Sequence, residues 1–144
     1  GQPFDNLTRV YSGSADDRTL NSSVARYQAA PAALLAIASR YQTSGRLPAP
    51  LVTLHTLKDP IVPYWHELLY LNKVWATRSG GRYATIPSVN YGHCNFTAPE
   101  MLIGFGLLVL NVTGEPLPDA QRVLPDDAAR AIYRQLAPKY GLRP

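Results

Sequence analysis

Residues 51–56, with the sequence LVTLHT, are the strongest single indication of the fold class. The run is apolar and rich in β-branched residues, and turn-forming segments bound it on both sides. A short continuous apolar run of this kind predicts a buried strand, and strands buried on both faces are typical of parallel sheets. The proline-containing segment 48–50 holds the chain extended ahead of it. Residues 57–60 (LKDP) form the loop at its carboxyl end.

The next segments predict a helix and a second strand. From Tyr64 the apolar residues follow helical spacing, and both tryptophans, Trp65 and Trp75, lie on the apolar face. Residues 79–81 (SGG) end this helix. Residues 82–88 predict a second strand, and Pro87 indicates an edge position because proline cannot donate to the hydrogen-bond ladder. The middle of the chain is therefore one β-α-β unit.

Two further helices complete the chain. Thr97 and Glu100 have the spacing of a capping box, and the helix that they begin should run to about Asn111, with Gly114 past its end. Its interior is apolar on nearly every face, which predicts heavy burial. A last amphipathic helix begins after residues 125–127 (PDD).

The first 47 residues predict two short helices, 21–27 after a cap at Asp16 or Asp17, and 32–41 after Pro31. The predicted order is helix, helix, strand, helix, strand, helix, helix, which belongs to the α/β class. Two parallel strands are not a stable sheet by themselves. We therefore expect the chain to form one end of a larger α/β sheet.

Composition narrows the function classes. The chain has 144 residues, enough for one ordinary domain, and its 46% hydrophobic and 17% charged residues exclude a disordered protein. The longest apolar run, 101–112, is broken by two glycines and is too short to span a bilayer. The net charge is +4, but the basic residues are spread along the chain, so no nucleic-acid partner is expected. A single cysteine, Cys94, excludes an internal disulfide and thiolate-rich metal sites.

Asp59 and His93 are the candidate catalytic residues. Each comes after the carboxyl end of a predicted strand, and ligands of open α/β sheets bind at that edge. An aspartate there can hold one imidazole nitrogen as a donor, which leaves the other nitrogen to take a proton from a nucleophile. The alternative is that Asp59 is a turn residue before Pro60 and His93 an ordinary loop histidine.

Other side chains offer weaker alternatives. Three side chains could in principle bind a metal ion: His55, His66 and Asp59. Their spacing matches no recognised ligand pattern, so no metal or other cofactor is expected. Cys94 could act as a thiol nucleophile, although neighbouring residues usually point apart and cysteine is commonly a small buried hydrophobe.

Two segments resemble the α/β-hydrolase superfamily. Residues 50–63 (PLVTLHTLKDPIVP) are similar to its penultimate strand and acid loop. Residues 91–96 (YGHCNF), followed by Glu100 and a long apolar helix, are similar to its histidine loop and closing helix. The order of acid and then histidine is also the order of that family. The resemblance covers residues 48–114 as the C-terminal part of the core. Residues 1–47 look like a cap or insertion segment, and 115–144 form a linker and a C-terminal helix.

The resemblance implies that Asp59 is the triad acid and His93 the general base of a serine hydrolase that acts on carboxylic esters or amides, including peptides. The chain contains no Gly-x-Ser-x-Gly elbow. Ser12, Ser14 and Ser44 lie near glycines but lack the strand–elbow–helix context. The nucleophile and the oxyanion hole are therefore expected on upstream sequence or on a second chain, and this chain alone should be inactive.

Several expectations concern partners. Gly1 is not a methionine and is the expected cut point from an upstream portion. The alternative function is a non-catalytic binding or assembly module, because an unpaired strand edge can pair with a partner or form a homo-oligomer. The compartment stays open, with a secreted or periplasmic protein after processing as one option.

Overall fold

The computed structural model describes residues 1–144 as two compact units, Gly1–Thr43 and Ser44–Pro144. The first unit contains helices α1 (Asp17–Ser23) and α2 (Pro31–Arg40). Asp16, one of the two predicted caps, is the N-cap of α1, and its carboxylate accepts a hydrogen bond from the Thr19 N–H.

The predicted helix over 21–27 is wrong in its bounds. Helix α1 starts earlier and ends at Ser23 because the next segment makes other backbone hydrogen bonds. The Asn6 N–H donates to the Tyr27 carbonyl, and the Ala30 N–H donates to the Gln2 carbonyl. Pairing with the N-terminal segment therefore replaces the last turn that local spacing predicted.

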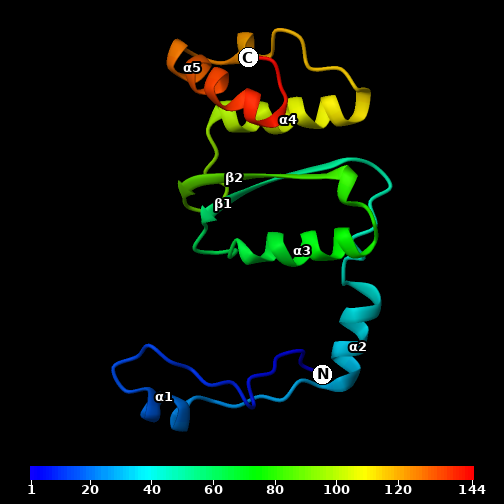
Figure 1. Ribbon diagram of the computed structural model, residues 1–144. Helices are drawn as coiled ribbons and strands as arrows, with labels where there is room; N and C mark the ends of the chain where they lie inside the picture. The colour runs from blue at the N-terminus through cyan, green and yellow to red at the C-terminus, as the bar shows by residue number, and fades with distance from the viewer. The chain divides into compact units, whose positions relative to one another are not determined.

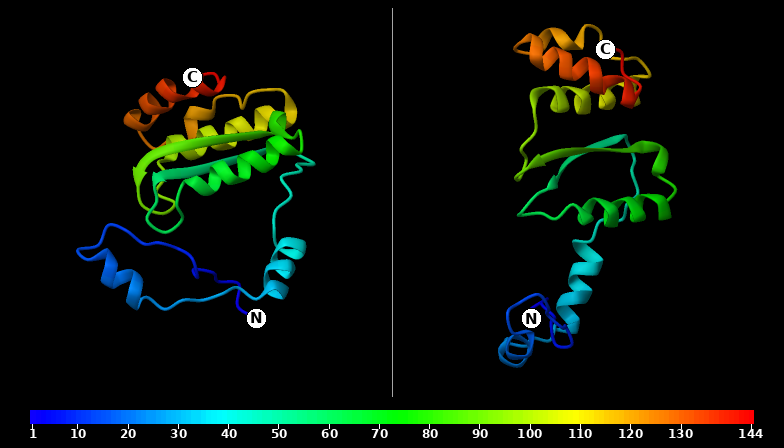
Figure 2. Two further views of the ribbon diagram at one scale, coloured as in Figure 1. Left: turned by 60° about the horizontal axis from the view of Figure 1, so that its bottom comes forward. Right: turned by 60° about the vertical axis from the view of Figure 1, so that its left-hand side comes forward.

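The second unit is layered (Figure 1). Helix α3 covers one face of the sheet, α4 covers the other, and α5 lies outside α4, an arrangement that both views of Figure 2 repeat. The elements are β1 (Leu51–Lys58), α3 (Trp65–Ala76), η1 (Gly80–Arg82), β2 (Tyr83–Tyr91), α4 (Ala98–Thr113), η2 (Ala120–Val123), α5 (Asp127–Leu136) and η3 (Ala137–Tyr140). With a two-stranded sheet and five α-helices, the chain belongs to the α/β class at this coarse level.

The two strands are parallel, as the sequence predicted. Their register pairs Leu51 with Tyr83 and continues to Thr56 with Ser88, after which Lys58 pairs with Tyr91. Two steps along β1, from 56 to 58, therefore match three along β2, from 88 to 91. The extra residue in β2 is a β-bulge, which bends a strand locally and changes the direction of the chain beyond it. The bulge lies near the end of β2, and the loop that carries His93 follows directly after the strand.

The hydrophobic core lies between the sheet, α4 and the C-terminal helical region. Ile103 in α4 and Tyr133 in α5 are almost completely buried and pack with Ile86 of β2. Half-buried residues of β1, Val52 and Leu54, contact the same cluster. The C-terminal segment after residue 114 is thus part of one compact unit with the sheet.

Helix α4 has the predicted ends. The Thr97 side chain accepts from the Glu100 N–H, and the Glu100 carboxylate accepts from the Thr97 N–H. Gly114 closes the helix in the left-handed region with φ of 78°. The expectation of burial on nearly every face is wrong for one side, because Met101 and Phe105 are more than half exposed. The core reaches only one side of the helix.

Helix α3 turns a polar residue toward the sheet. One Glu67 carboxylate oxygen accepts hydrogen bonds from the hydroxyls of Thr53 (2.8 Å), Tyr83 (2.6 Å) and Thr85 (3.3 Å). Desolvation, followed by the contact with Glu67, raises the pKa of Tyr83 to about 12. The tryptophans that share the apolar stripe, Trp65 and Trp75, are 53% and 64% exposed. The apolar stripe is present, but α3 packs against the sheet with another side.

Each strand pairs on one side only, so both outer edges of the sheet lack a strand partner. An unpaired edge displays free N–H and carbonyl groups to a neighbouring strand. None of the helices is both long and apolar enough to cross a membrane.

Candidate active site

Asp59 lies in the loop between β1 and α3, and its carboxylate is held from three directions. One oxygen, Oδ1, accepts from the backbone N–H groups of Ile61 (2.8 Å) and Val62 (2.9 Å). The other, Oδ2, lies 2.7 Å from Nδ1 of His93. The side chain of Asp59 is only 3% exposed. The turn that begins at Asp59 therefore fixes the orientation of its own carboxylate.

The surroundings of Asp59 favour its charged form. Burial alone would raise the pKa of this carboxyl. The amide of Val62, the imidazole of His93 and the amide of Ile61 outweigh that effect and lower the pKa to about 2. Asp59 is thus a carboxylate at neutral pH, ready to accept a hydrogen bond.

His93 stands on a tight turn after β2. The residue before it, Gly92, has a φ of +113°, and the residue after it, Cys94, has a φ of +53°. Gly92 suits a conformation that other residues rarely adopt. Its N–H donates to the Lys58 carbonyl (3.2 Å), and its carbonyl accepts from the Thr56 hydroxyl (2.5 Å). The end of β1 therefore holds the backbone from which His93 projects.

The pair has a defined proton arrangement. Because the Asp59 carboxylate can only accept, Nδ1 of His93 is the donor of their hydrogen bond. A neutral imidazole then carries its acceptor lone pair on Nε2. The side chain of His93 is 44% exposed, so this ring is accessible to a proton donor. An imidazole held in this way can act as a general base, with the carboxylate setting its tautomer.

Stability in acid tests the Asp59 environment. Its pKa is lower in the folded state than the ordinary 3.8, so ionised Asp59 stabilises the fold above about pH 4, and this stabilisation disappears as the pH falls toward 2. We expect the free energy of unfolding to fall more steeply over this window for the native chain than for Asp59→Asn. Urea unfolding at a series of pH values measures the difference. Parallel profiles for both proteins would contradict the assigned environment.

The other sequence candidates take no part in the hydrogen bond between Asp59 and His93. His55 packs edge-on against Tyr64, with its Nδ1 2.9 Å from the Thr56 carbonyl. His66 stacks on Trp65. Cys94 is exposed and has no disulfide partner. No group of three or more His, Cys, Asp and Glu side chains is arranged to hold a metal ion.

Within Ser44–Pro144, no serine hydroxyl is hydrogen-bonded to the imidazole of His93. Ser14 donates to Asp17, and the Ser44 hydroxyl accepts from the Arg46 N–H. Ser88, which precedes the bulge, is buried at 1% exposure. The imidazole of His93 has no serine hydroxyl among its hydrogen-bond partners.

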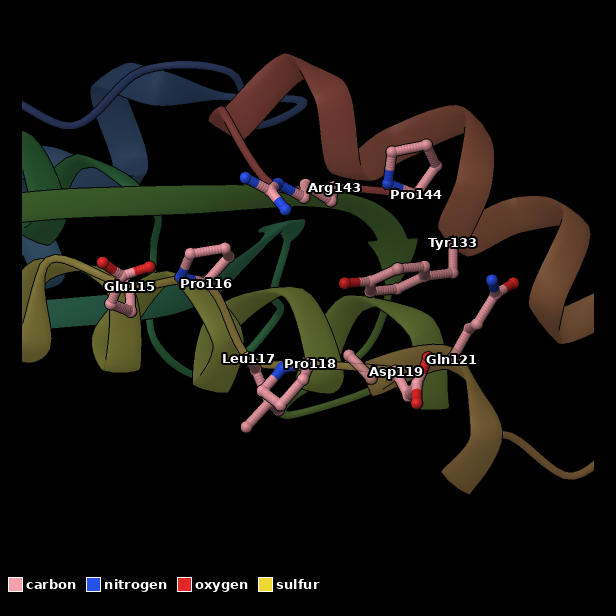
Figure 3. Close-up of a pocket in the computed structure, with 10 residues that line it drawn as sticks. Glu115, Pro116, Leu117, Pro118, Asp119, Gln121, Tyr133, Arg143 and Pro144 are labelled. Carbon is pink, nitrogen blue, oxygen red and sulfur yellow. The ribbon is translucent and has the colours of Figure 1, made fainter.

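Two cavities of the second unit lie away from Asp59 and His93. Figure 3 shows one formed by the segment after α4 and the chain end, with Tyr133 pointing into it between Gln121 and Arg143. A smaller apolar cavity lies between β2, α4 and α5, and Ile86, Ile103 and Leu136 are among its lining residues. Neither Asp59 nor His93 lines these cavities, so the pair lies outside both.

Sequence reasoning selected Asp59 and His93 but missed Gly92, which forms the turn before His93, and Thr56, which holds that turn. The sequence pattern places Thr56 only in the buried strand. The glycine directly before His93 was a usable signal, because such a residue after a strand often marks a backbone turn with positive φ.

Comparison of the chain with models of known families, with curated proteins and with solved structures finds no match.

Proposed function

We propose that this chain supplies the acid and the general base of a serine hydrolase with an α/β-hydrolase fold. Residues 48–114 would form the end of its parallel sheet and 1–47 a cap segment. The observation that carries the proposal is the 2.7 Å contact between Asp59 Oδ2 and His93 Nδ1, made at the carboxyl ends of two adjacent parallel strands. The order of acid and histidine along the chain supports it.

The proposed chemistry is acyl transfer to water. Nε2 of His93 takes the proton of a serine hydroxyl while the serine oxygen attacks the carbonyl carbon of an ester or amide. The imidazolium, stabilised by Asp59, then gives that proton to the leaving group as the bond to it breaks. In the second half, Nε2 of His93 takes a proton from water while the water oxygen attacks the acyl carbon now bonded to the serine. The imidazolium then returns that proton to the serine oxygen as the acyl–serine bond breaks and the carboxylic acid leaves. The serine and the oxyanion-hole donors would come from another part of the assembled enzyme, joined at the free sheet edge.

An activity-based probe tests this proposal. A fluorophosphonate labels only an activated serine, so the native preparation should contain a labelled serine peptide on a polypeptide bound or joined to this chain. The label should fall at least tenfold when His93 is replaced by alanine, and it should persist in His66→Ala, whose imidazole stacks on Trp65 away from the pair. No labelled serine in the native protein would contradict the proposal.

A second function, a non-catalytic assembly module, has its own supporting observation. The outer sheet edges are unpaired, and α3 exposes Trp65, Leu68 and Trp75. Exposed apolar surface of this kind is typical of interaction sites. Sedimentation separates the outcomes: a dimer or complex without a reactive serine would favour the module, including self-association through the strand edge.

A further inference from the structure

The backbone around Gly92 is held on both sides by β1. The peptide group before Gly92 is fixed through its N–H, which donates to the Lys58 carbonyl at 3.2 Å. The peptide group after Gly92 is fixed through its carbonyl, which accepts from the Thr56 hydroxyl at 2.5 Å. The φ and ψ angles of Gly92 are the rotations between these two groups. The two hydrogen bonds therefore hold the glycine in its positive-φ conformation.

The second of these bonds acts on the histidine directly. The Gly92 carbonyl belongs to the same peptide group as the N–H of His93. A rotation of that group would carry the Cα of His93 away from its place opposite Asp59. Glycine resists such a rotation less than any other residue. The restraint must therefore come from a partner outside the turn.

Thr56 has the features that such a partner needs. Its side chain is 1% exposed, so water does not compete for its hydroxyl, and the Gly92 carbonyl accepts the bond that this hydroxyl donates. It lies on β1, opposite Ser88 and immediately before the β-bulge. The rest of the turn is closed locally, by the Asn95 amide donating to the Tyr91 carbonyl at 2.9 Å.

We propose that Thr56 is the positioning residue of His93, with its buried hydroxyl fixing the Gly92 carbonyl so that the imidazole meets the Asp59 carboxylate. The role is defined within this chain by the geometry of the pair. Its importance for catalysis rests on the proposed function.

NMR of the complete chain tests the proposal without substrate or serine. In the native protein the ¹⁵N spectrum of His93 should show a protonated Nδ1, and titration of the Asp59 carboxyl should show the lowered pKa, about 2. Thr56→Val removes the hydroxyl while keeping the branched shape. The variant should lose the single tautomer, and the pKa of Asp59 should rise by a few tenths of a unit or more, because the His93 contribution weakens.

Two control variants accompany this test. Thr56→Ser keeps the hydroxyl and should show both native signals, the protonated Nδ1 of His93 and the lowered pKa of Asp59. Thr53→Val removes a hydroxyl of the same strand that donates to Glu67, and it should leave both signals unchanged. Thr56→Ala repeats the test if valine does not fit the site. Native signals in folded Thr56→Val or Thr56→Ala would overturn the proposal. If both variants unfolded while Thr56→Ser folded, the hydroxyl would have a stabilising role only, and the proposal would also be overturned.

An activity measurement adds an independent arm. In the assembled hydrolase, Thr56→Val should lower kcat about 10- to 100-fold with little change in KM, because a misplaced base slows the chemical step rather than binding. If no hydrolase activity were found, the proposed function and this activity test would both fail. The NMR test of the positioning role of Thr56 would still apply. A native tautomer in Thr56→Val would overturn the positioning role even in an active enzyme.

Discussion

In the proposed hydrolase, replacing His93 with alanine is expected to lower kcat/KM by about 10³-fold or more, because the serine would lose its base and the leaving group its acid. Asp59→Asn should also be severe, by about 10²- to 10⁴-fold. The asparagine keeps the shape but removes the charge that holds Nδ1 protonated and stabilises the imidazolium. Steady-state hydrolysis of an activated ester measures both losses.

The matched control is His66→Ala. His66 lies at the start of α3 and stacks on its neighbour Trp65, so its loss should leave kcat/KM within a few fold of the native value. Each variant should keep its far-ultraviolet circular dichroism. A folded His93→Ala protein with activity near the native level would show that another group is the base.

The second large effect concerns stability. Gly45 has a φ of +77°, and a Cβ at this position would meet the carbonyl group of Lys73 in the last turn of α3, 2.5 Å from its oxygen. That atom is helix backbone and cannot rotate away. Gly45→Ala combines an unfavourable backbone conformation with a steric clash, so we expect it to destabilise Ser44–Pro144 by about 3 kcal/mol or more. Thermal unfolding should show the change as a Tm lower by about 12 °C or more.

Gly81→Ala provides the comparison for this variant. Gly81 has no positive φ, and a Cβ there would meet no atom within 4 Å. Its substitution should change the free energy of unfolding by less than about 1 kcal/mol. Equal Tm values for the two alanine variants would show that the contact between Gly45 and α3 does not stabilise the unit.

Local signals in the sequence were enough to predict the β-α-β unit, the capping box at Thr97 and the placement of Asp59 and His93 at strand ends. Each depends on residues close together in the chain: an apolar run, a Thr–Glu spacing, or a polar residue after a strand. The carboxyl ends of parallel strands meet at one sheet edge, so two such residues can be brought together without knowing the full sheet. The end of α1 was mispredicted because backbone bonds to the N-terminal segment, distant along the chain, replaced helical ones.

The remaining features arise only when distant segments pack. Spacing placed both tryptophans on the apolar face of α3. In the structure, Glu67 faces the sheet and accepts from the hydroxyls of Thr53 and Tyr83, while Trp65 and Trp75 are exposed. The bulge in β2 depends on its register against β1, and the hydrogen bond from Thr56 to Gly92 joins residues 36 positions apart.

The residue types for an acid–base pair can be recognised in the sequence alone. The 2.7 Å geometry of the pair requires the packing of β1 against the histidine loop, because only tertiary contacts can hold a glycine turn in one conformation.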